Sequence, residues 1–216
     1  MKRLINFLTL ILFFSCNNEK NITIEEEGLS ILYTKEFKEV MTNPRFIKIQ
    51  LDSIKNFSTL IDRMGELSCD RKISGLSFVY DKTEYNLIGS VPCPISADIL
   101  CYFRVNHIFI KNDSLYTSRG KTKVKQPIEY LGKYIDDLIQ KTYTHHYKED
   151  KMKTAIINLN IEDQYPISTT KKVLSEIYNE FNRIALEKGE DYFKYHILFE
   201  KFVFLNIPPP PPPPSK

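Results

Sequence analysis

One short segment of the sequence carries the residue types of a metal site. It contains His145, His146, Glu149 and Asp150. In a helix, His145 and Glu149 would share one face, but zinc needs three or four ligands converging at about 2 Å, and nothing nearby supplies a clear third ligand. The segment lies between a predicted helix and a predicted strand, so we interpret it as a solvated loop and expect no metal and no cofactor. A metal-dependent hydrolase that uses His145, His146 and Glu149 is the alternative.

Two pairs of adjacent acids could also serve in acid–base chemistry: Asp136–Asp137 and Glu162–Asp163. General acid–base catalysis needs groups that converge on one substrate atom, whereas neighbouring side chains in a helix or strand point in different directions. The sequence has no P-loop, dinucleotide-binding fingerprint, nucleophile elbow or zinc-protease helix. We therefore expect a non-catalytic protein that acts by binding.

The N-terminal residues have the layout of a secretory signal peptide. Lys2 and Arg3 precede the apolar stretch 4–14, and the small residue Ser15 stands directly before Cys16. The stretch is much shorter than the roughly 20 residues that a membrane-spanning helix needs. It therefore predicts export and cleavage, with residues 1–15 as the signal peptide.

The step from Ser15 to Cys16 resembles the bacterial lipobox, although Phe13 and Phe14 depart from its usual residues. The resemblance implies that Cys16 becomes the lipidated first residue of the mature protein. Two or more acyl chains anchor a protein stably, so lipid on Cys16 would hold a water-exposed domain at a membrane. Residues 16–28 would form a polar leash, and the protein would lie in the cell envelope, facing the periplasm or the cell exterior. A secreted, unlipidated protein is the alternative.

Three further cysteines, Cys69, Cys93 and Cys101, would be exported with the domain. Export permits a disulfide, but three thiols leave one unpaired. Cys93 and Cys101 are candidates because they could close a short loop around Pro94. Spacing alone does not fix the geometry that a disulfide needs.

The composition is that of a folded protein without a nucleic-acid footprint. The chain has 216 residues and a formal charge of +3, of which Lys2 and Arg3 contribute two, so the mature chain would carry 3 − 2 = +1. The basic run at 119–125 alternates with Gly and Thr, which is typical of a solvated loop. Nucleic-acid-binding proteins carry clustered basic surfaces, so nucleic acid is not an expected partner.

The N-terminal half, residues 29–98, is predicted to be an α+β subdomain. Strict alternation of apolar residues indicates strands, and a spacing of three to four residues indicates helices. These patterns predict helices at 29–41 and 57–67, and strands at 45–51, 73–80 and 84–90. Pro92 and Pro94 interrupt regular structure and place a boundary near residues 91–98.

The C-terminal half, residues 99–206, is predicted to follow the order β-β-α-β-α-β. The strands are expected at 101–110, 114–117, 154–162 and 195–205, and the helices at 127–139 and 168–189. Ser168 or Thr169 would cap the second helix, and Gly189 would end it. Two helices can cover one face of a small sheet, so the expected fold class is α+β. Residues 207–216 would form a stiff polyproline tail, either a binding motif or an inert rod.

The order of elements in this half has a counterpart in a known family. A hairpin at 105–115 precedes helix 128–139, strand 155–163, a Tyr165-Pro166 step into helix 170–186, and strand 196–199. This order resembles the periplasmic domain of the ExbD/TolR family of biopolymer-transport proteins. Family members have a transmembrane helix whose Asp couples to proton flux, and stretch 4–14 is short and lacks Asp, so that function is not carried over. The resemblance implies a homodimer, or a domain that contacts an envelope protein or the cell wall.

Overall fold

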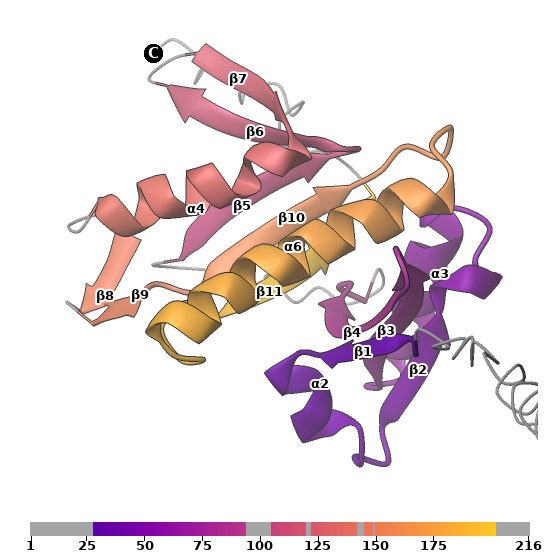
Figure 1. The fold of residues 1–216 in the computed structure, drawn as a ribbon. Helices are drawn as coiled ribbons and strands as arrows, with labels where there is room; N and C mark the ends of the chain where they lie inside the picture. The colour runs from indigo at the N-terminus through magenta and orange to yellow at the C-terminus, as the bar shows by residue number, and fades with distance from the viewer. Residues whose placement is uncertain (1–27, 94–104, 120–121, 142–144, 149, 202–216) are drawn as a thin grey trace, which may run out of the picture.

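The computed structural model describes residues 28–93, 105–119, 122–141, 145–148 and 150–201, which form a mixed α/β fold around one large sheet (Figure 1). The N-terminal half contains β1 (Ser30–Tyr33), α2 (Lys35–Val40), β2 (Phe46–Gln50), α3 (Phe57–Cys69), β3 (Ile73–Tyr80) and β4 (Thr83–Ser90). The C-terminal half contains β5 (Asn106–Lys111), β6 (Ser114–Arg119), β7 (Thr122–Pro127), α4 (Leu131–Gln140), β8 (His146–Lys148), β9 (Lys151–Met152), β10 (Ala155–Asn160), α6 (Ile167–Lys188) and β11 (Tyr195–Phe199). Short 3-10 turns, Leu51–Ser53 and Ile128–Tyr130, precede α3 and α4.

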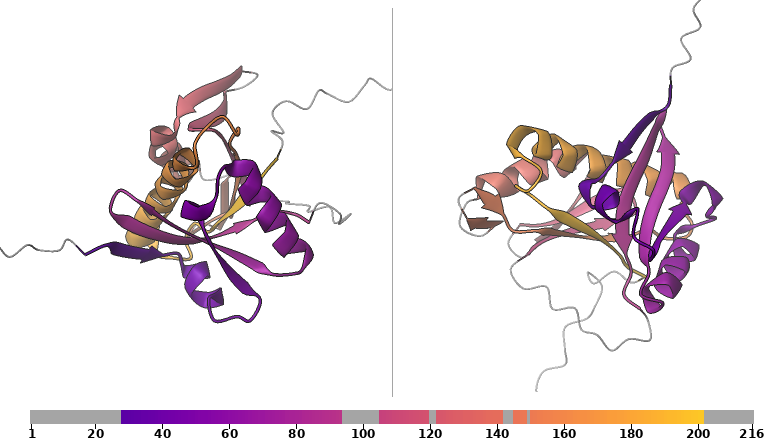
Figure 2. Two further views of the ribbon diagram at one scale, coloured as in Figure 1. Left: turned by 90° about the vertical axis from the view of Figure 1, so that its right-hand side faces the viewer. Right: turned by 90° about the horizontal axis from the view of Figure 1, so that it is seen from below.

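The main sheet joins the two halves of the chain. As far as it is described it has nine strands in the order β2-β3-β4-β11-β10-β5-β6-β7, with β1 also paired to β4. Along its length β4 pairs in parallel first with β1 and then with β11, through Gly89↔Ile197 and Ser90↔Leu198. The strands of the two halves cross at a steep angle in Figure 2, so the sheet twists strongly where β4 meets β11.

The longer helices α3, α4 and α6 contribute buried residues to one core on one face of the sheet. Helices α4 and α6 lie side by side over β5 and β10 (Figure 1). The short α2 covers the opposite face, because successive strand residues point to opposite sides and Phe37 lies over Gly75 and not over Leu76. A Cβ on Gly75 would stand only 2.3 Å from the ring of Phe46, so a glycine is needed where the two phenylalanines pack.

Polar contacts also connect the halves outside the core. Asp163, just beyond β10, accepts a hydrogen bond of 3.0 Å from the backbone N–H of Ser58 in the first turn of α3. The first N–H groups of a helix lack partners within the helix, so this carboxylate satisfies one of them and faces the positive end of the helix dipole. Lys201 pairs with Asp62 at 2.9 Å. The two halves of the chain therefore share one sheet and one core, and the predicted boundary falls within this shared fold.

Two local predictions, the helix at 29–41 and the loop at 119–125, are wrong because strand pairing and helix capping determine the structure there. Residues 29–41 form β1 and then α2, since Thr34 ends the strand and caps the helix by accepting a hydrogen bond of 3.2 Å from the N–H of Phe37. The run at 119–125 contributes to β7, which pairs antiparallel with β6, and is not simply a loop.

The second C-terminal helix also begins differently from the prediction. Pro166 occupies the N-cap position of α6 and no side chain caps the helix, whereas Gly189 ends α6 with a φ of 101°, as expected of a glycine stop. The predicted β-β-α-β-α-β order is not confirmed, since β7 and the β8–β9 hairpin interrupt it and the sheet extends into the N-terminal half. None of the described helices has both the length and the apolar character to cross a membrane.

Candidate functional site

The two histidines of the predicted metal cluster hydrogen-bond to different parts of the fold. Nδ1 of His145 lies 2.6 Å from Oδ1 of Asn106 at the start of β5, and Nε2 of His146 lies 2.8 Å from the carbonyl oxygen of Ile139 near the end of α4. Burial, aided by nearby lysines, lowers the pKa of His145. Glu149 lies outside the described residues, and within them no three His, Cys, Asp or Glu side chains are grouped to hold a metal.

Three of the four acids with possible acid–base chemistry, Asp136, Glu162 and Asp163, lie in separate ion pairs and caps. Asp136 accepts a hydrogen bond of 2.9 Å from Arg183, which ties α4 to α6. Glu162 pairs with Lys111 at 2.8 Å, and hydrogen bonds from Lys111 lower the pKa of Glu162. Its neighbour Asp163 caps α3, as described above. These carboxylates therefore connect elements of the fold and do not converge on a common point.

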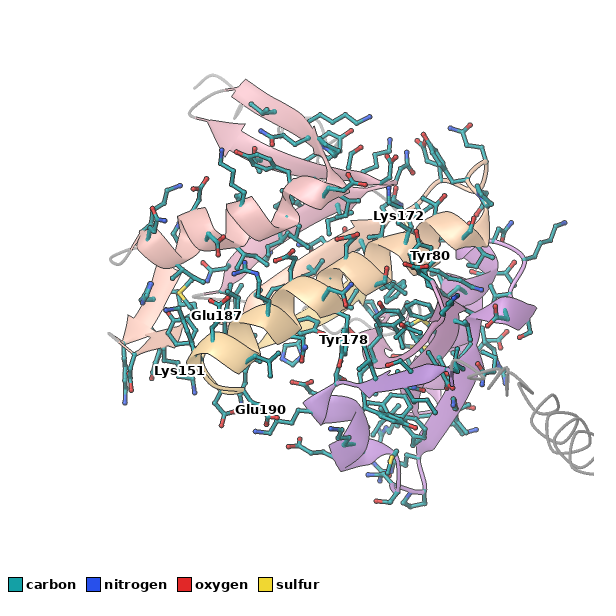
Figure 3. All side chains as sticks on the ribbon, in the orientation of Figure 1. Tyr80, Lys151, Lys172, Tyr178, Glu187 and Glu190 are labelled. Atoms are coloured by element: carbon teal, nitrogen blue, oxygen red, sulfur yellow. A yellow bond between two sulfur atoms is a disulfide. The ribbon has the colours of Figure 1, made fainter. Side chains whose placement is uncertain are left out.

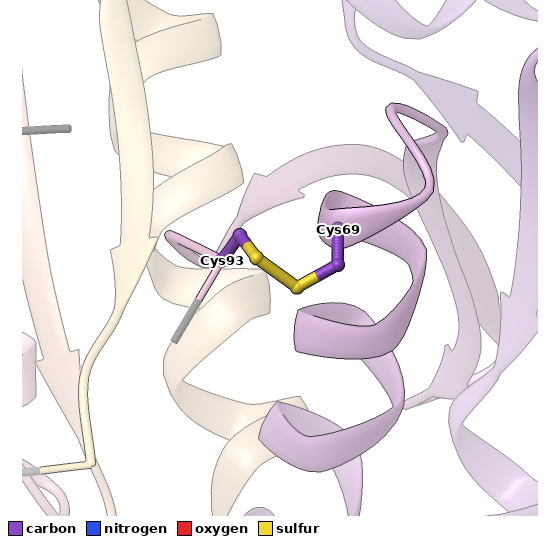
Figure 4. The surroundings of a disulfide bond; sticks show 2 residues. All are labelled: Cys69 and Cys93. Atoms are coloured by element: carbon purple, nitrogen blue, oxygen red, sulfur yellow. A yellow bond between two sulfur atoms is a disulfide. The ribbon is translucent and has the colours of Figure 1, made fainter. Parts of the chain in front are cut away.

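Cys93 is bonded to Cys69, so the Cys93–Cys101 pairing considered from the sequence is wrong (Figure 4). Cys69 is the last residue of α3, and Cys93 follows β4. The β3–β4 hairpin returns the chain to the end of α3, which places the two Cα atoms 4.9 Å apart across 24 positions of sequence. This separation is within the range that a disulfide requires. Cys16 and Cys101 lie outside the described residues.

A hollow with a cavity volume of about 220 Å³ runs between the edge strand β1 and helix α6. We call it the β1–α6 groove. One wall consists of β1 and the start of α2, and the other consists of the C-terminal half of α6 and the start of β11. Figure 3 shows Tyr178 and Glu190 on the α6 side of this space, facing β1 and α2. Its lining residues include Ile31, Tyr33, Lys35, Tyr178 and Tyr195.

The groove lies where the neighbour of β4 changes from β1 to β11. β1 ends beside Asn86, and the pairing of β11 with β4 begins at Gly89. Neither strand pairs with β4 between these positions, and a smaller hollow of about 70 Å³ lies there, lined by Thr34 and Tyr195 among others.

Tyrosine hydroxyls supply much of the polar chemistry of the groove. Tyr178 donates a hydrogen bond of 3.4 Å to the carbonyl oxygen of Tyr33, which connects α6 to β1 across the space. Burial raises the pKa of both Tyr178 and Tyr195, so the two hydroxyls stay protonated at neutral pH. The proton of Tyr178 is donated to Tyr33, so towards a ligand its oxygen can act as an acceptor. Such groups can hold a polar backbone or amide, but they are poor bases at that pH.

Charged residues close one end of the groove. Lys35 lies 3.3 Å from Asp191 and 3.6 Å from Glu190, and Lys194 lies 2.9 Å from Asp191. A hydrogen bond from Lys35 to Asp191 raises the pKa of Lys35. Positive and negative charges are mixed here, so the groove has no strong preference for an anion or a cation.

No motif in the sequence points to this groove. Its facing residues Tyr33 and Tyr178 are 145 positions apart, and their types are common in any core. Only the pairing of β4 with both β1 and β11 brings them together. No family model, no curated protein and no solved structure matches this chain.

Proposed function

We propose that this chain is a lipid-anchored protein of the bacterial cell envelope that acts by binding a partner and not by catalysis. The observation that carries the proposal is the layout of the first sixteen residues, in which a basic start and a short apolar stretch lead to Ser15 and Cys16. The disulfide between Cys69 and Cys93 supports export, since such bonds persist in oxidising compartments and are rare in the cytosol.

The β1–α6 groove is the contact site that we propose. Its protonated tyrosine hydroxyls and aromatic walls suit a polypeptide or another amide-rich polymer of the envelope. From Cys16 to Gly28 the chain takes 28 − 16 = 12 residue steps, which reach at most about 40 Å when fully extended. A partner would therefore lie close to the membrane that holds the lipid.

The order of elements in the C-terminal half supports an ExbD/TolR-like domain as part of this proposal. The order of elements that resembles the ExbD/TolR domain is present as hairpin β5–β6, helix α4, strand β10, helix α6 and strand β11. Strand β7 and the β8–β9 hairpin are additional. The proposal includes an envelope protein or the cell wall as partner, and a homodimer as an assembly state.

Changing Cys16→Ser is expected to remove membrane attachment. The variant should lose incorporated palmitate and move from the membrane to the soluble fraction, because no acyl chain remains to hold it. Cell fractionation and metabolic lipid labelling measure both effects, and Cys101→Ser serves as the matched control that should stay at the membrane. Unchanged processing and fractionation of Cys16→Ser would contradict the lipid anchor.

A photo-crosslinking amino acid in place of Lys38, which lines the groove, is expected to capture a discrete partner in the intact envelope. The same photo-crosslinking amino acid in place of Tyr147 is the control. Tyr147 is 62% exposed on β8 and does not line the groove. Electrophoresis should show adducts of defined mass from position 38 and none from position 147. Equal patterns from the two positions would mean that the groove is not the contact site.

A further inference from the structure

The outer edge of β1 has backbone groups that no described strand pairs with. Among the described strands β1 pairs only with β4, and the N–H of Thr34 donates to the carbonyl oxygen of Asn86 at 2.9 Å. Backbone groups of a strand point alternately to its two sides, so those of Ile31 and Tyr33 point away from β4. The bond from Tyr178 to the carbonyl oxygen of Tyr33 agrees with this direction. No backbone group in the described ranges therefore pairs with this edge from Leu29 to the N–H of Tyr33.

Exposed apolar side chains accompany this open edge. Ile31 and Val79 stand on either side of Glu84 in one cross-strand row and are 50% and 42% exposed. Leu29 is 46% exposed, and alternation along the strand places it on the same face as Ile31. Edge strands are normally protected by a charged residue, a proline or a bulge, and β1, with the sequence Ser-Ile-Leu-Tyr, has neither charge nor proline. Both the edge and the face beside it lack a cover among the described residues.

The chain that enters β1 has the pattern of a strand that could provide this cover. Asn21-Ile-Thr-Ile24 alternates polar and apolar residues, and residues 25–28, three glutamates and a glycine, separate it from Leu29. Two alternating segments joined by three to five residues with a glycine are typical of a β-hairpin.

The register of such a hairpin follows from its loop. A four-residue loop at 25–28 places Ile24 opposite Leu29 and Ile22 opposite Ile31. Residues directly opposite each other share one face, so Ile22 and Ile24 would cover the two exposed side chains. A shift by one residue would place Thr23 opposite Ile31 and turn both isoleucines to the other face.

We propose that residues 21–24 dock on the open edge of β1 as an antiparallel strand. Ile22 then exchanges two backbone hydrogen bonds with Ile31, and the N–H of Tyr33 lies opposite Lys20. The added strand ends there, because Tyr178 already holds the carbonyl oxygen of Tyr33.

The docked strand also changes the reach of the anchor, a consequence that rests on the proposed lipidation of Cys16. With residues 21–24 docked, the free leash runs only from Cys16 to Lys20, or 20 − 16 = 4 residue steps. Its maximum length falls from about 40 Å to about 14 Å, so the domain is held directly against the bilayer. The docking itself does not depend on lipid.

Amide hydrogen exchange in the mature chain, measured by NMR, tests the docking. The amides of Ile31 and Tyr33 are expected to be protected, and Ile22→Pro, which removes the N–H that donates to Ile31, should speed their exchange at least tenfold. The amides of Leu32 and Thr34 bond to β4 and should keep their rates in the variant, which shows that the fold is intact. Asn18→Pro is the control outside the docked segment and should leave all four rates unchanged.

Two results would overturn the proposal. Equal exchange of Ile31 and Tyr33 in the parent chain and Ile22→Pro would mean that the edge stays open. Protection that increases with protein concentration would mean that a second copy covers it. Neither result bears on the lipid anchor, which the fractionation of Cys16→Ser tests separately.

Discussion

Replacing both Cys69 and Cys93 by Ala is expected to lower the free energy of unfolding by about 3 kcal/mol. A disulfide stabilises mainly by restricting the unfolded chain, and for a loop closed across 24 positions the chain-entropy relation gives this size. The bond also attaches the end of α3 to the segment after β4. Urea unfolding followed by circular dichroism measures the loss, and reductant should lower the stability of the parent protein by a similar amount.

Cys101→Ala is the matched control for this prediction. With Cys69 bonded to Cys93, the control should unfold at the same urea concentration as the parent protein, within about 0.5 kcal/mol. Mass spectrometry of a non-reduced digest identifies the bonded pair directly. A large loss in Cys101→Ala together with little loss in Cys69→Ala would instead favour the pairing of Cys93 with Cys101.

Elements with a strong local pattern were predicted well from the sequence. The helix expected at 57–67 is α3, Phe57–Cys69, which Asn56 caps by accepting a hydrogen bond from the N–H of Thr59. The strand expected at 73–80 matches β3, and its partner β4 begins one residue before the predicted 84–90. In these segments the spacing of apolar residues, the caps and the turn at Asp81-Lys82 all favour the same structure.

Elements that depend on distant partners were not predicted. β1 is only four residues long and is a strand because it pairs with β4, more than fifty positions later. β7 has the composition of a loop and becomes a strand because β6 offers an edge to it. Local pattern contains no information on such pairings, since strand formation depends on neighbours across the sheet.

The same limit applies to the candidate site. The β1–α6 groove joins residues 31–38 to residues 178–195, and no motif connects these segments in the sequence. The disulfide partner of Cys93 followed from the return of the β3–β4 hairpin to α3, which spacing between cysteines does not reveal. The signal layout before Cys16, in contrast, is local and is read from composition and order alone.

Glu200→Gln is expected to raise the free energy of unfolding by about 1.5 kcal/mol at pH 8. The backbone of Glu200 is fixed by its N–H to the carbonyl oxygen of Leu159 and by a hydrogen bond of 2.8 Å from Asn160 to its own carbonyl oxygen. Its side chain is half-buried, and within the described part of the chain no group hydrogen-bonds to its Oε1. Burial raises the pKa of Glu200 to about 7.

The sign of the pH dependence follows from this raised pKa. In the unfolded chain the carboxyl ionises near pH 4.5, whereas in the folded protein it stays protonated until about pH 7. The stability of the parent protein should therefore be full below pH 4.5 and fall as the pH rises to 7, because across this range the unfolded chain releases the proton while burial makes the folded state retain it. The full shift in the pKa of Glu200 corresponds to about 3 kcal/mol of stability, and we halve this value because the side chain is partly exposed to solvent.

Glutamine has nearly the shape of glutamate and does not ionise, so Glu200→Gln removes the pH-dependent part alone. Thermal unfolding should give a melting temperature about 3–6 °C above that of the parent protein at pH 8, and the two curves should converge near pH 4.5. Glu190→Gln is the control, since Glu190 is exposed and pairs only loosely with Lys35. If the difference between Glu200→Gln and the parent protein were the same at pH 4.5 and pH 8, packing and not ionisation would determine it, and the buried carboxyl would not titrate near neutrality.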